Sequence, residues 1–316
     1  MNKAVVICGP TSTGKTSLAL RLCKAFNGEI ISADSRQAYK YMDIGTGKLP
    51  VDKSFSQIEK YDGFWKVIGT PIYMYDVVSP AKSYSVYNYS KKAQNELLSI
   101  QERQKFPFIV GGTGFYIDVL TGKKPISNIP PNIKLREELN KKSLEELQSI
   151  LRKTNENKYA LIDINNKARL IRAVEISQSK GVQNTEKDKN CSLDILSIGL
   201  TAPRKFLYGK ADWWVEKIVE KGIILETKNL LDYGFRETAP MKGMVYSSAV
   251  DYLDEKIPLS DMKQKVKWDI HGYIRRQLTW FGRNAKIRWF NIAEKGFDIE
   301  VLKTVQSFLD GGKKIL

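Results

Sequence analysis

The sequence has little of what a zinc protein, a disulfide-rich protein or a membrane protein needs. Its 316 residues include one histidine, His271, and three cysteines, Cys8, Cys23 and Cys191, with no Cys-x-x-Cys spacing. No zinc site or disulfide framework can be read from these residues. No apolar run approaches the roughly 20 residues that span a bilayer, and no signal-peptide pattern stands at the start. We therefore expect a cytoplasmic protein without membrane contact, in which any metal is Mg²⁺ held by oxygen atoms.

What the sequence does contain is organised around a stretch near its start. A short apolar run stops at Gly9, and Gly9-x-x-x-x-Gly14-Lys15-Thr16 fits the phosphate-binding loop, or P-loop, at every fixed position. Glycines let backbone N–H groups surround phosphate oxygens, and the helix that follows directs its positive dipole end at the same anion. The lysine adds a charge, and the threonine hydroxyl can bind Mg²⁺. The alternative, a glycine-rich turn without a ligand, leaves the strand before it and the amphipathic run after it unexplained.

Two further apolar runs end in segments suited to chemistry. Residues 29–33 lead into Asp34, and residues 106–110 run into Gly111-Gly112-Thr113-Gly114. Ligands of doubly wound sheets lie beyond the carboxyl ends of the strands, so we expect Asp34 to point toward the phosphate crevice. The second glycine-rich strand end implies a close approach of backbone to ligand. Two plainer interpretations stay open: Asp34 as an outer carboxylate near Mg²⁺, and Thr113 as a helix cap.

The order of segments predicts an α/β fold with a P-loop, a mostly parallel sheet flanked by helices, and a small helical insertion domain. Residues 1–120 form the first part of the core. Residues 121–190 form the insertion: a proline-containing linker (122–131), a Lys/Glu/Asn-rich helical stretch (133–179) and a polar segment (181–190). Residues 191–316 form the second part of the core, with a strand at 193–200, a helix pair over 210–233, a long helix capped by Ser260 that ends near Gly282, and a last strand at 287–292.

The charge balance indicates a polyanionic partner. Lys and Arg number 51 against 35 Asp and Glu, a formal charge of +16, and 36 of the basic residues follow Leu120. Residues 260–289 carry eight basic side chains interleaved with five aromatic ones. That composition suits phosphate contact and base stacking, although aromatic residues at helical spacing are more often core residues, and the charge could be only a basic surface.

Several motifs in this order resemble the tRNA dimethylallyltransferases, also called tRNA isopentenyltransferases. They are Gly9–Thr16, Ser32-Ala-Asp34-Ser35-Arg36-Gln37-Ala-Tyr39, Met42-Asp-Ile-Gly-Thr-Gly-Lys48, Val110-Gly-Gly-Thr113-Gly-Phe-Tyr116, Arg169-Leu-Ile-Arg172-Ala-Val-Glu175 and Arg275-Arg276-Gln277-Leu-Thr-Trp280-Phe281. The resemblance covers nearly the whole chain. The sequence departs from the family pattern at Ile72-Tyr73, where a His-His pair is usual, at Val245-Tyr246-Ser247, where a Gly-Tyr-basic motif is usual, and at Trp214, where an arginine is usual.

The resemblance implies transfer of a dimethylallyl group from dimethylallyl diphosphate to N6 of the adenosine 3′ of the anticodon in tRNA, with release of diphosphate. Asp34 is then the general base and Thr113 lines the reaction channel. The residues implied in diphosphate binding are Gly9, Thr11, Ser12, Thr13, Gly14, Lys15, Thr16 and Arg276, with Thr16 also on Mg²⁺. The residues implied in tRNA binding are Ser35, Arg36, Gln37, Lys48, Arg275 and Gln277. The insertion binds the anticodon stem-loop, and we expect the protein to act as a monomer.

Other interpretations stay open at this point. The same chemistry could act on a free adenine nucleotide, or the P-loop could belong to a small-molecule kinase; neither needs a basic long helix or an insertion. A non-catalytic RNA-binding relic is a third possibility. Among single residues, Arg276 could form a structural ion pair, and Gln37 could orient the Asp34 loop rather than touch RNA. We expect His271 to have no catalytic task and Arg169, Arg172 and Glu175 to be structural.

Overall fold

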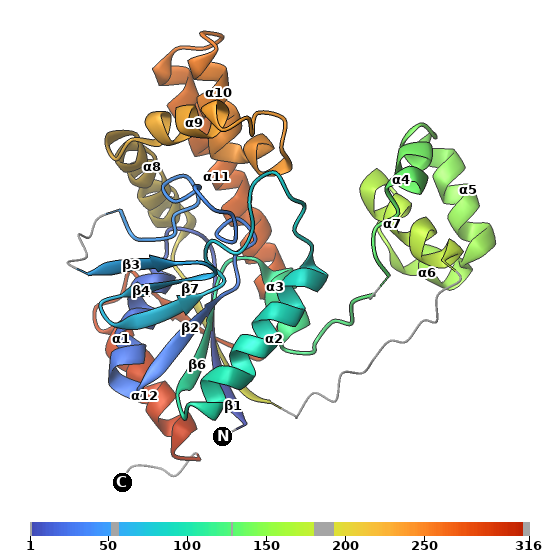
Figure 1. Cartoon of the computed structure of the whole chain (residues 1–316). Helices are drawn as coiled ribbons and strands as arrows, with labels where there is room; N and C mark the ends of the chain where they lie inside the picture. Colours follow the sequence, from blue (N-terminus) through green and yellow to red (C-terminus); the bar gives the residue numbers. More distant parts are fainter. Residues whose placement is uncertain (1, 52–56, 128, 180–192, 312–316) are drawn as a thin grey trace. The chain divides into compact units, whose positions relative to one another are not determined.

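The chain folds as two units in the computed structural model, which describes residues 2–51, 57–127, 129–179 and 193–311. One unit consists of residues 1–124 and 191–316, and the other consists of residues 125–190. Figure 1 shows both with their secondary structure. In the described residues, no helix is long and apolar enough to cross a membrane.

The larger unit is built on a mostly parallel sheet. Its strands are β1 (Lys3–Cys8), β2 (Gly28–Ser32), β3 (Ile58–Tyr61), β4 (Phe64–Val67), β5 (Thr70–Tyr73), β6 (Phe106–Val110), β7 (Asp194–Thr201) and β8 (Ile287–Asn291), in the order β3-β4-β5-β2-β6-β1-β7-β8. From β5 to β8 all neighbours are parallel, and β3 and β4 add an antiparallel edge. β1 and β6, the strands before the two glycine-rich segments, lie side by side at the centre. Their continuous apolar sequences suit strands buried on both faces.

Helices cover both faces of this sheet (Figure 1). On one face α1 (Lys15–Phe26) and α12 (Phe297–Leu309) pack against Val5, Ile7 and their neighbours. On the other face, α2 (Val86–Glu102) and α3 (Gly114–Leu120) pack against Val6 and its neighbours. Alternating side chains of one strand therefore enter two separate cores, as the pleat requires.

A third apolar core joins the remaining helices of the larger unit. These are α8 (Arg204–Glu220), α9 (Ile223–Asp232), the 3₁₀ turn η1 (Ala239–Lys242), α10 (Met244–Leu253) and α11 (Leu259–Gly282). α11 begins directly after its N-cap Pro258, no described side chain caps it, and the Ser260 hydroxyl bonds to Asp261, so the prediction that Ser260 caps this helix is wrong. Proline has no N–H, so it removes one of the donors that lack a partner at a helix start.

The smaller unit is helical. It contains α4 (Ile133–Asn140), α5 (Leu144–Thr154), α6 (Glu156–Leu161) and α7 (Lys167–Gln178) around a leucine-rich core. Buried Glu175 pairs with Arg136 at 2.8 Å and with Arg172 at 2.5 Å. The structural role expected for Arg172 and Glu175 is thereby confirmed, whereas Arg169 pairs with Asp163 instead. Residues 181–190, expected to be a polar connection, lie outside the described residues.

The predicted α/β fold with a mostly parallel P-loop sheet is confirmed, and so are its central strands. Elements that were not foreseen include the edge strand β3, the helix α10 and the last helix α12. The helix pair expected over 210–233 begins earlier, at Arg204. These differences leave the position of the glycine-rich segments unchanged.

Candidate active site

The loop between β1 and α1 has the backbone of a phosphate cradle. Gly9 and Gly14 have φ of 131° and 78°, and Ser12 has φ of 63°. A Cβ on Gly9 would lie 2.3 Å from the Leu200 carbonyl oxygen, so only glycine fits. Gly14 is the N-cap of α1, and in the described structure no side chain caps that helix. The first N–H groups of α1 thus remain directed at the loop, where an anion is favoured.

Lys15 lies in this loop, and its ammonium has a lowered pKa. Its ammonium donates to the Pro10 carbonyl at 2.7 Å, and buried Thr13 donates to the same oxygen at 2.8 Å. Enclosure by protein lowers the pKa of Lys15 to about 8, although the negative charge of Asp34 works against this shift. The lysine and the aspartate that the sequence singled out therefore lie close enough to interact.

Asp34 follows β2, and its carboxylate accepts the Arg36 N–H at 2.9 Å. Enclosure raises the pKa of Asp34; the Arg36 N–H and the charge of Lys15 oppose that shift without cancelling it. A carboxylate with a raised pKa is a better proton acceptor near neutral pH. The geometry thus suits the role of a general base.

Thr113 is tied to the same strand end. Its hydroxyl oxygen accepts the Ser35 N–H at 3.1 Å, and its own N–H donates to the Ala33 carbonyl at 3.1 Å. Although Thr113 is the N-cap of α3, its side chain makes no capping bond in the described structure. A Cβ on Gly111 would lie 2.1 Å from the Ala33 oxygen, which explains the glycine. The carboxyl ends of β2 and β6 are therefore locked together around Asp34 and Thr113.

Helix α11 closes the site from another part of the chain. The Gln277 amide accepts the Thr11 N–H of the P-loop at 2.8 Å and donates to the Gly112 carbonyl at 2.9 Å. Gln277 is 4% exposed, so this predicted tRNA contact instead bridges the two glycine-rich loops. Arg276 is exposed, with its guanidinium carbon 5.7 Å from the Tyr273 ring centre. No ion pair of Arg276 occurs among the described residues, which leaves it available for a diphosphate.

Two tyrosines of the site were not assigned a role from the sequence. Enclosure and the Asp34 carboxylate raise the pKa of Tyr273, and a hydrogen bond with Thr113 acts in the opposite direction. Enclosure and Asp34 likewise raise the pKa of Tyr75, whose hydroxyl donates to the Lys48 carbonyl at 2.6 Å. The only signal for Tyr273 was its place one helical turn before Gln277. Tyr75 gave none, because its contacts span strands far apart in the sequence.

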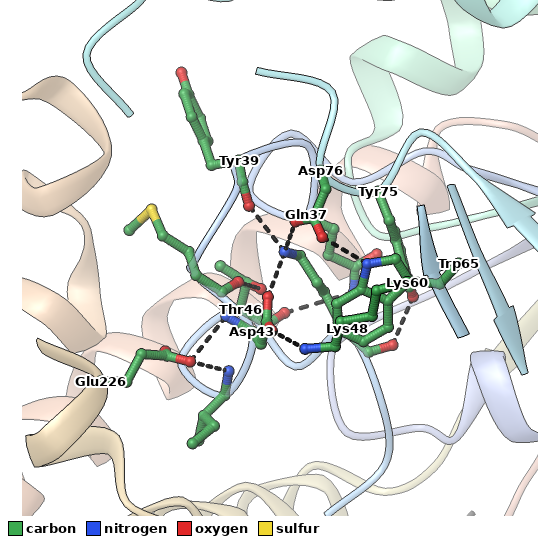
Figure 2. A network of polar contacts seen from close by, with 12 residues as sticks. Gln37, Tyr39, Asp43, Thr46, Lys48, Lys60, Trp65, Tyr75, Asp76 and Glu226 are labelled. Carbon is green, nitrogen blue, oxygen red and sulfur yellow. Dashed lines mark hydrogen bonds and ion pairs between the residues drawn. The ribbon is translucent and has the colours of Figure 1, made fainter. Parts of the chain in front are cut away.

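A buried polar network supports the loop after Asp34 (Figure 2). Gln37 accepts from the Ser32 hydroxyl at 2.7 Å and donates to the Gly47 carbonyl at 3.0 Å. The interpretation that Gln37 orients this loop therefore fits its contacts. Lys48, expected to bind tRNA, is fully buried, and its ammonium lies 2.6 Å from Asp43, 2.5 Å from Asp76 and 2.8 Å from the Tyr39 carbonyl. A lysine with these partners holds the loop and cannot reach RNA.

Glu226 of α9 fixes the other end of this loop. Its carboxylate accepts three consecutive N–H groups, of Asp43 at 2.9 Å, Ile44 at 2.8 Å and Gly45 at 3.0 Å. The Tyr246 hydroxyl adds a fourth bond at 2.7 Å. Tyr246 belongs to the segment that departs from the family pattern, yet its hydroxyl has a defined structural role. Figure 2 shows Glu226 meeting the loop from the side of α9.

The remaining predicted contacts lie on the surface near the site. Arg36 is exposed and donates to the Pro240 carbonyl at 3.3 Å. Arg275 is exposed and donates to the Tyr208 hydroxyl at 3.3 Å. His271 pairs with Asp212 at 2.8 Å and stacks on Tyr208.

The other two departures from the family pattern also have defined surroundings. The Tyr73 hydroxyl donates to Glu29 at 3.1 Å and accepts from Arg103 at 2.8 Å. The Trp214 ring lies against Gly47, 3.6 Å from where a Cβ would stand. Neither residue contacts Asp34 or Thr113 in the described contacts.

Comparisons with known proteins agree with this geometry. Residues 37–284 match the family described as IPP transferase, and residues 2–61 match isopentenyl transferase. A tRNA dimethylallyltransferase of Carboxydothermus hydrogenoformans is 35% identical over 306 residues, covering 94% of both chains, and that of Halalkalibacterium halodurans is 33% identical, covering 98% of this chain and 97% of the relative. The crystal structure of the full-length tRNA isopentenylpyrophosphate transferase from Bacillus halodurans superposes with a TM-score of 0.71 at 32% identity, covering 100% of this chain and 99% of that one. A eukaryotic dimethylallyltransferase acting on tRNA shares the fold, with a TM-score of 0.79 at 22% identity over 99% of this chain and 81% of its own.

Proposed function

The chain belongs to the IPP transferase family, and from this premise we propose that it transfers a dimethylallyl group from dimethylallyl diphosphate to N6 of the adenosine 3′ of the anticodon in tRNA. Diphosphate is the other product. One observation carries the proposal: a P-loop lysine and a carboxylate of raised pKa interact at the strand end where Thr113 is fixed. A plain phosphate-binding turn needs no such carboxylate.

The leaving diphosphate is stabilised by the loop. The N–H groups at the start of α1, the Lys15 ammonium and the exposed Arg276 guanidinium supply positive charge where negative charge grows as the C1–O bond breaks. Gln277 holds the Thr11 N–H in place, and so keeps the loop in its binding geometry.

The adenine amine needs a proton acceptor. As its N6 forms a bond to C1 of the dimethylallyl group, one N6 proton passes to the Asp34 carboxylate. The raised pKa of Asp34 favours this transfer, and the hydroxyls of Thr113 and Tyr273 line the space beside it. Bond formation to N6, loss of its proton and departure of diphosphate together balance atoms and charge.

The oxygen donors at the site fit Mg²⁺. Thr16 follows Lys15 in the P-loop, its hydroxyl contacts Tyr75, and it offers the hard oxygen ligand that Mg²⁺ prefers. When bound, the ion neutralises charge on the diphosphate. In the described residues no three His, Cys, Asp or Glu side chains gather as a metal site, so Thr16, diphosphate oxygens and water would complete the coordination.

The target base must leave its stack to reach Asp34, as enzymes that act on bases require. We propose that Ser35, Arg36 and Arg275 contact tRNA beside the site and that the helical unit of residues 125–190 binds the anticodon stem-loop. The basic charge of the chain supports a polyanionic substrate. We further propose that the protein acts as a monomer in the cytoplasm.

The experiment is transfer from labelled dimethylallyl diphosphate, with Mg²⁺, to unmodified tRNA carrying adenosine beside the anticodon, or to free AMP, followed by nucleoside mass analysis. Added dimethylallyl mass on adenosine of tRNA alone supports the proposal. Label on AMP alone would assign the chain to free-nucleotide chemistry, and label on neither would contradict transfer altogether.

A further inference from the structure

A groove of about 320 Å³ lies between the loop around Tyr41 and helix α9, outside the active site. Its volume is at the lower end of the range for small-ligand sites. Its lining includes Tyr41, Ile44, Lys221, Leu225, Asn229 and Tyr233. None of them belongs to the P-loop or to the Asp34 and Thr113 pair.

Exposed aromatic rings form one side of this groove. Tyr41 is 54% exposed and Tyr233 is 58% exposed, with ring centres 5.5 Å apart. The ring of Phe235 supports both, at 6.4 Å from Tyr41 and 6.1 Å from Tyr233. Leu225 on the same helix is 62% exposed. Flat rings left open to solvent beside an aliphatic side chain suit a planar apolar ligand.

The backbone of Tyr41 is held in an unfavourable conformation. Its φ of 66° lies in the left-handed region, which a bulky residue rarely adopts. Such conformations persist where the surroundings enforce them, often at binding sites. The loop that follows is held by Glu226, which also lines the groove and whose carboxylate accepts N–H groups of Asp43, Ile44 and Gly45 (Figure 2). These three donors partly compensate the negative charge of that carboxylate.

Two polar side chains at the groove have no protein partner in the described structure. Asn229 and Lys221 are both exposed, and neither the Asn229 amide nor the Lys221 ammonium makes a side-chain hydrogen bond to a described residue. An amide offers both a donor and an acceptor to the edge of a base, and an ammonium pairs with a phosphate. Stacking rings, an edge-reading amide and one cation are the parts of a nucleobase site.

We propose that this groove binds a nucleobase of the RNA substrate other than the target adenosine. The base stacks on one of the rings of Tyr41 and Tyr233, while the other ring, tilted by 51° to the first, contacts its edge. Asn229 pairs with the base, and Lys221 pairs with the phosphate. This inference rests on the proposed function for its substrate. The groove is connected to the active site along the chain. The segment after Phe235 leads to Pro240, whose carbonyl accepts a hydrogen bond from Arg36, two residues after Asp34. A single lysine is weak anchorage for a free nucleotide, which favours a base already tethered in RNA.

The test is the dissociation constant for an anticodon stem-loop RNA, measured by fluorescence anisotropy without dimethylallyl diphosphate. We expect Tyr41→Gly and Tyr233→Leu each to weaken binding about tenfold, since base–aromatic stacking is of that size. Tyr41→Gly also relieves the backbone, so its thermal midpoint should equal or exceed that of the unaltered protein. The matched control is Tyr61→Leu, because Tyr61 is 44% exposed and stacked on Phe64 but lies on the edge strand β3.

Binding of both groove variants within twofold of the unaltered protein, like the control, would overturn the proposal. So would displacement of the stem-loop by an equal concentration of free AMP or CMP, because the groove would then be a nucleotide site. A failure of the proposed function would appear elsewhere, as no dimethylallyl transfer to tRNA by the unaltered protein.

Discussion

Lys15 and Asp34 influence each other's pKa. Enclosure disfavours the charged form of each, lowering the pKa of Lys15 to about 8 and raising that of Asp34, while their mutual attraction offsets part of both shifts. A bound diphosphate adds negative charge beside Lys15 and therefore favours its ammonium. Binding of the anion and protonation of the lysine are coupled.

This coupling predicts how affinity depends on pH. Below about pH 8 Lys15 is an ammonium that attracts the anion, and above it the side chain is increasingly neutral. We expect affinity for inorganic diphosphate to fall as pH rises from 7.5 to 9.5, and calorimetry near pH 8 to show proton uptake. Lys15→Met should bind weakly at every pH, without proton uptake. An affinity that is flat across this range would contradict the pKa shift.

Thr113 offers a second test at the residue scale. Its hydroxyl accepts the Ser35 N–H, so Thr113→Val leaves that donor unpaired, at a cost of about 1–3 kcal/mol, and frees the strand end that carries Asp34. We expect the single-turnover rate of transfer to fall about tenfold or more in Thr113→Val and to be largely kept in Thr113→Ser. Equal rates in both variants would show that the hydroxyl has no part in positioning.

Helix α11 acts as a clamp on the P-loop through one amide. We expect Gln277→Leu to weaken diphosphate binding about tenfold, because Thr11 loses its acceptor and the loop its bridge to Gly112. The matched control is Gln306→Leu on α12, whose amide bonds to Asp310 at the surface and to no other described side chain. Equal diphosphate affinities of both variants would show that Gln277 does not hold the P-loop in its binding conformation.

How much the sequence could predict follows from how local each signal is. The P-loop and the strand ends before Asp34 and Thr113 were readable because each depends on residues close together in the chain. The burial of Lys48 could not be predicted, because Asp76 and the Tyr39 carbonyl contact it from other segments of the chain. The roles of Tyr75, Tyr273 and Glu226 could not be predicted for the same reason. Helix α12 was not predicted either. Its apolar side chains pack into the same core as side chains of β1 and β7, a contact between distant segments of the chain.

At the scale of the whole molecule, ion pairing reduces the charge that is free to meet RNA. Lys263 and Lys267 belong to the basic stretch whose composition suits phosphate contact, yet both ammonium groups lie 2.7 Å from the Glu216 carboxylate. We now expect Lys263→Ala/Lys267→Ala to leave the slope of log Kd for tRNA against log salt nearly unchanged. Arg275→Ala, which removes an exposed guanidinium, should reduce that slope by about 0.7–0.9. A larger fall of the slope in Lys263→Ala/Lys267→Ala than in Arg275→Ala would contradict this expectation and place RNA against these two lysines of α11.

The proposed mechanism depends on Asp34 taking the proton from N6 in a site that RNA enters. The measurement that tests this is the single-turnover rate of dimethylallyl transfer in Asp34→Asn, with stem-loop affinity measured on the same protein. We expect a rate about a hundredfold to ten-thousandfold lower with affinity within a few-fold, since general bases contribute on that scale. In the unaltered protein the rate should fall on the acid side at a pH above the usual aspartate range, because the pKa of Asp34 is raised. An unchanged rate in Asp34→Asn, or RNA binding that collapses with it, would contradict the claim.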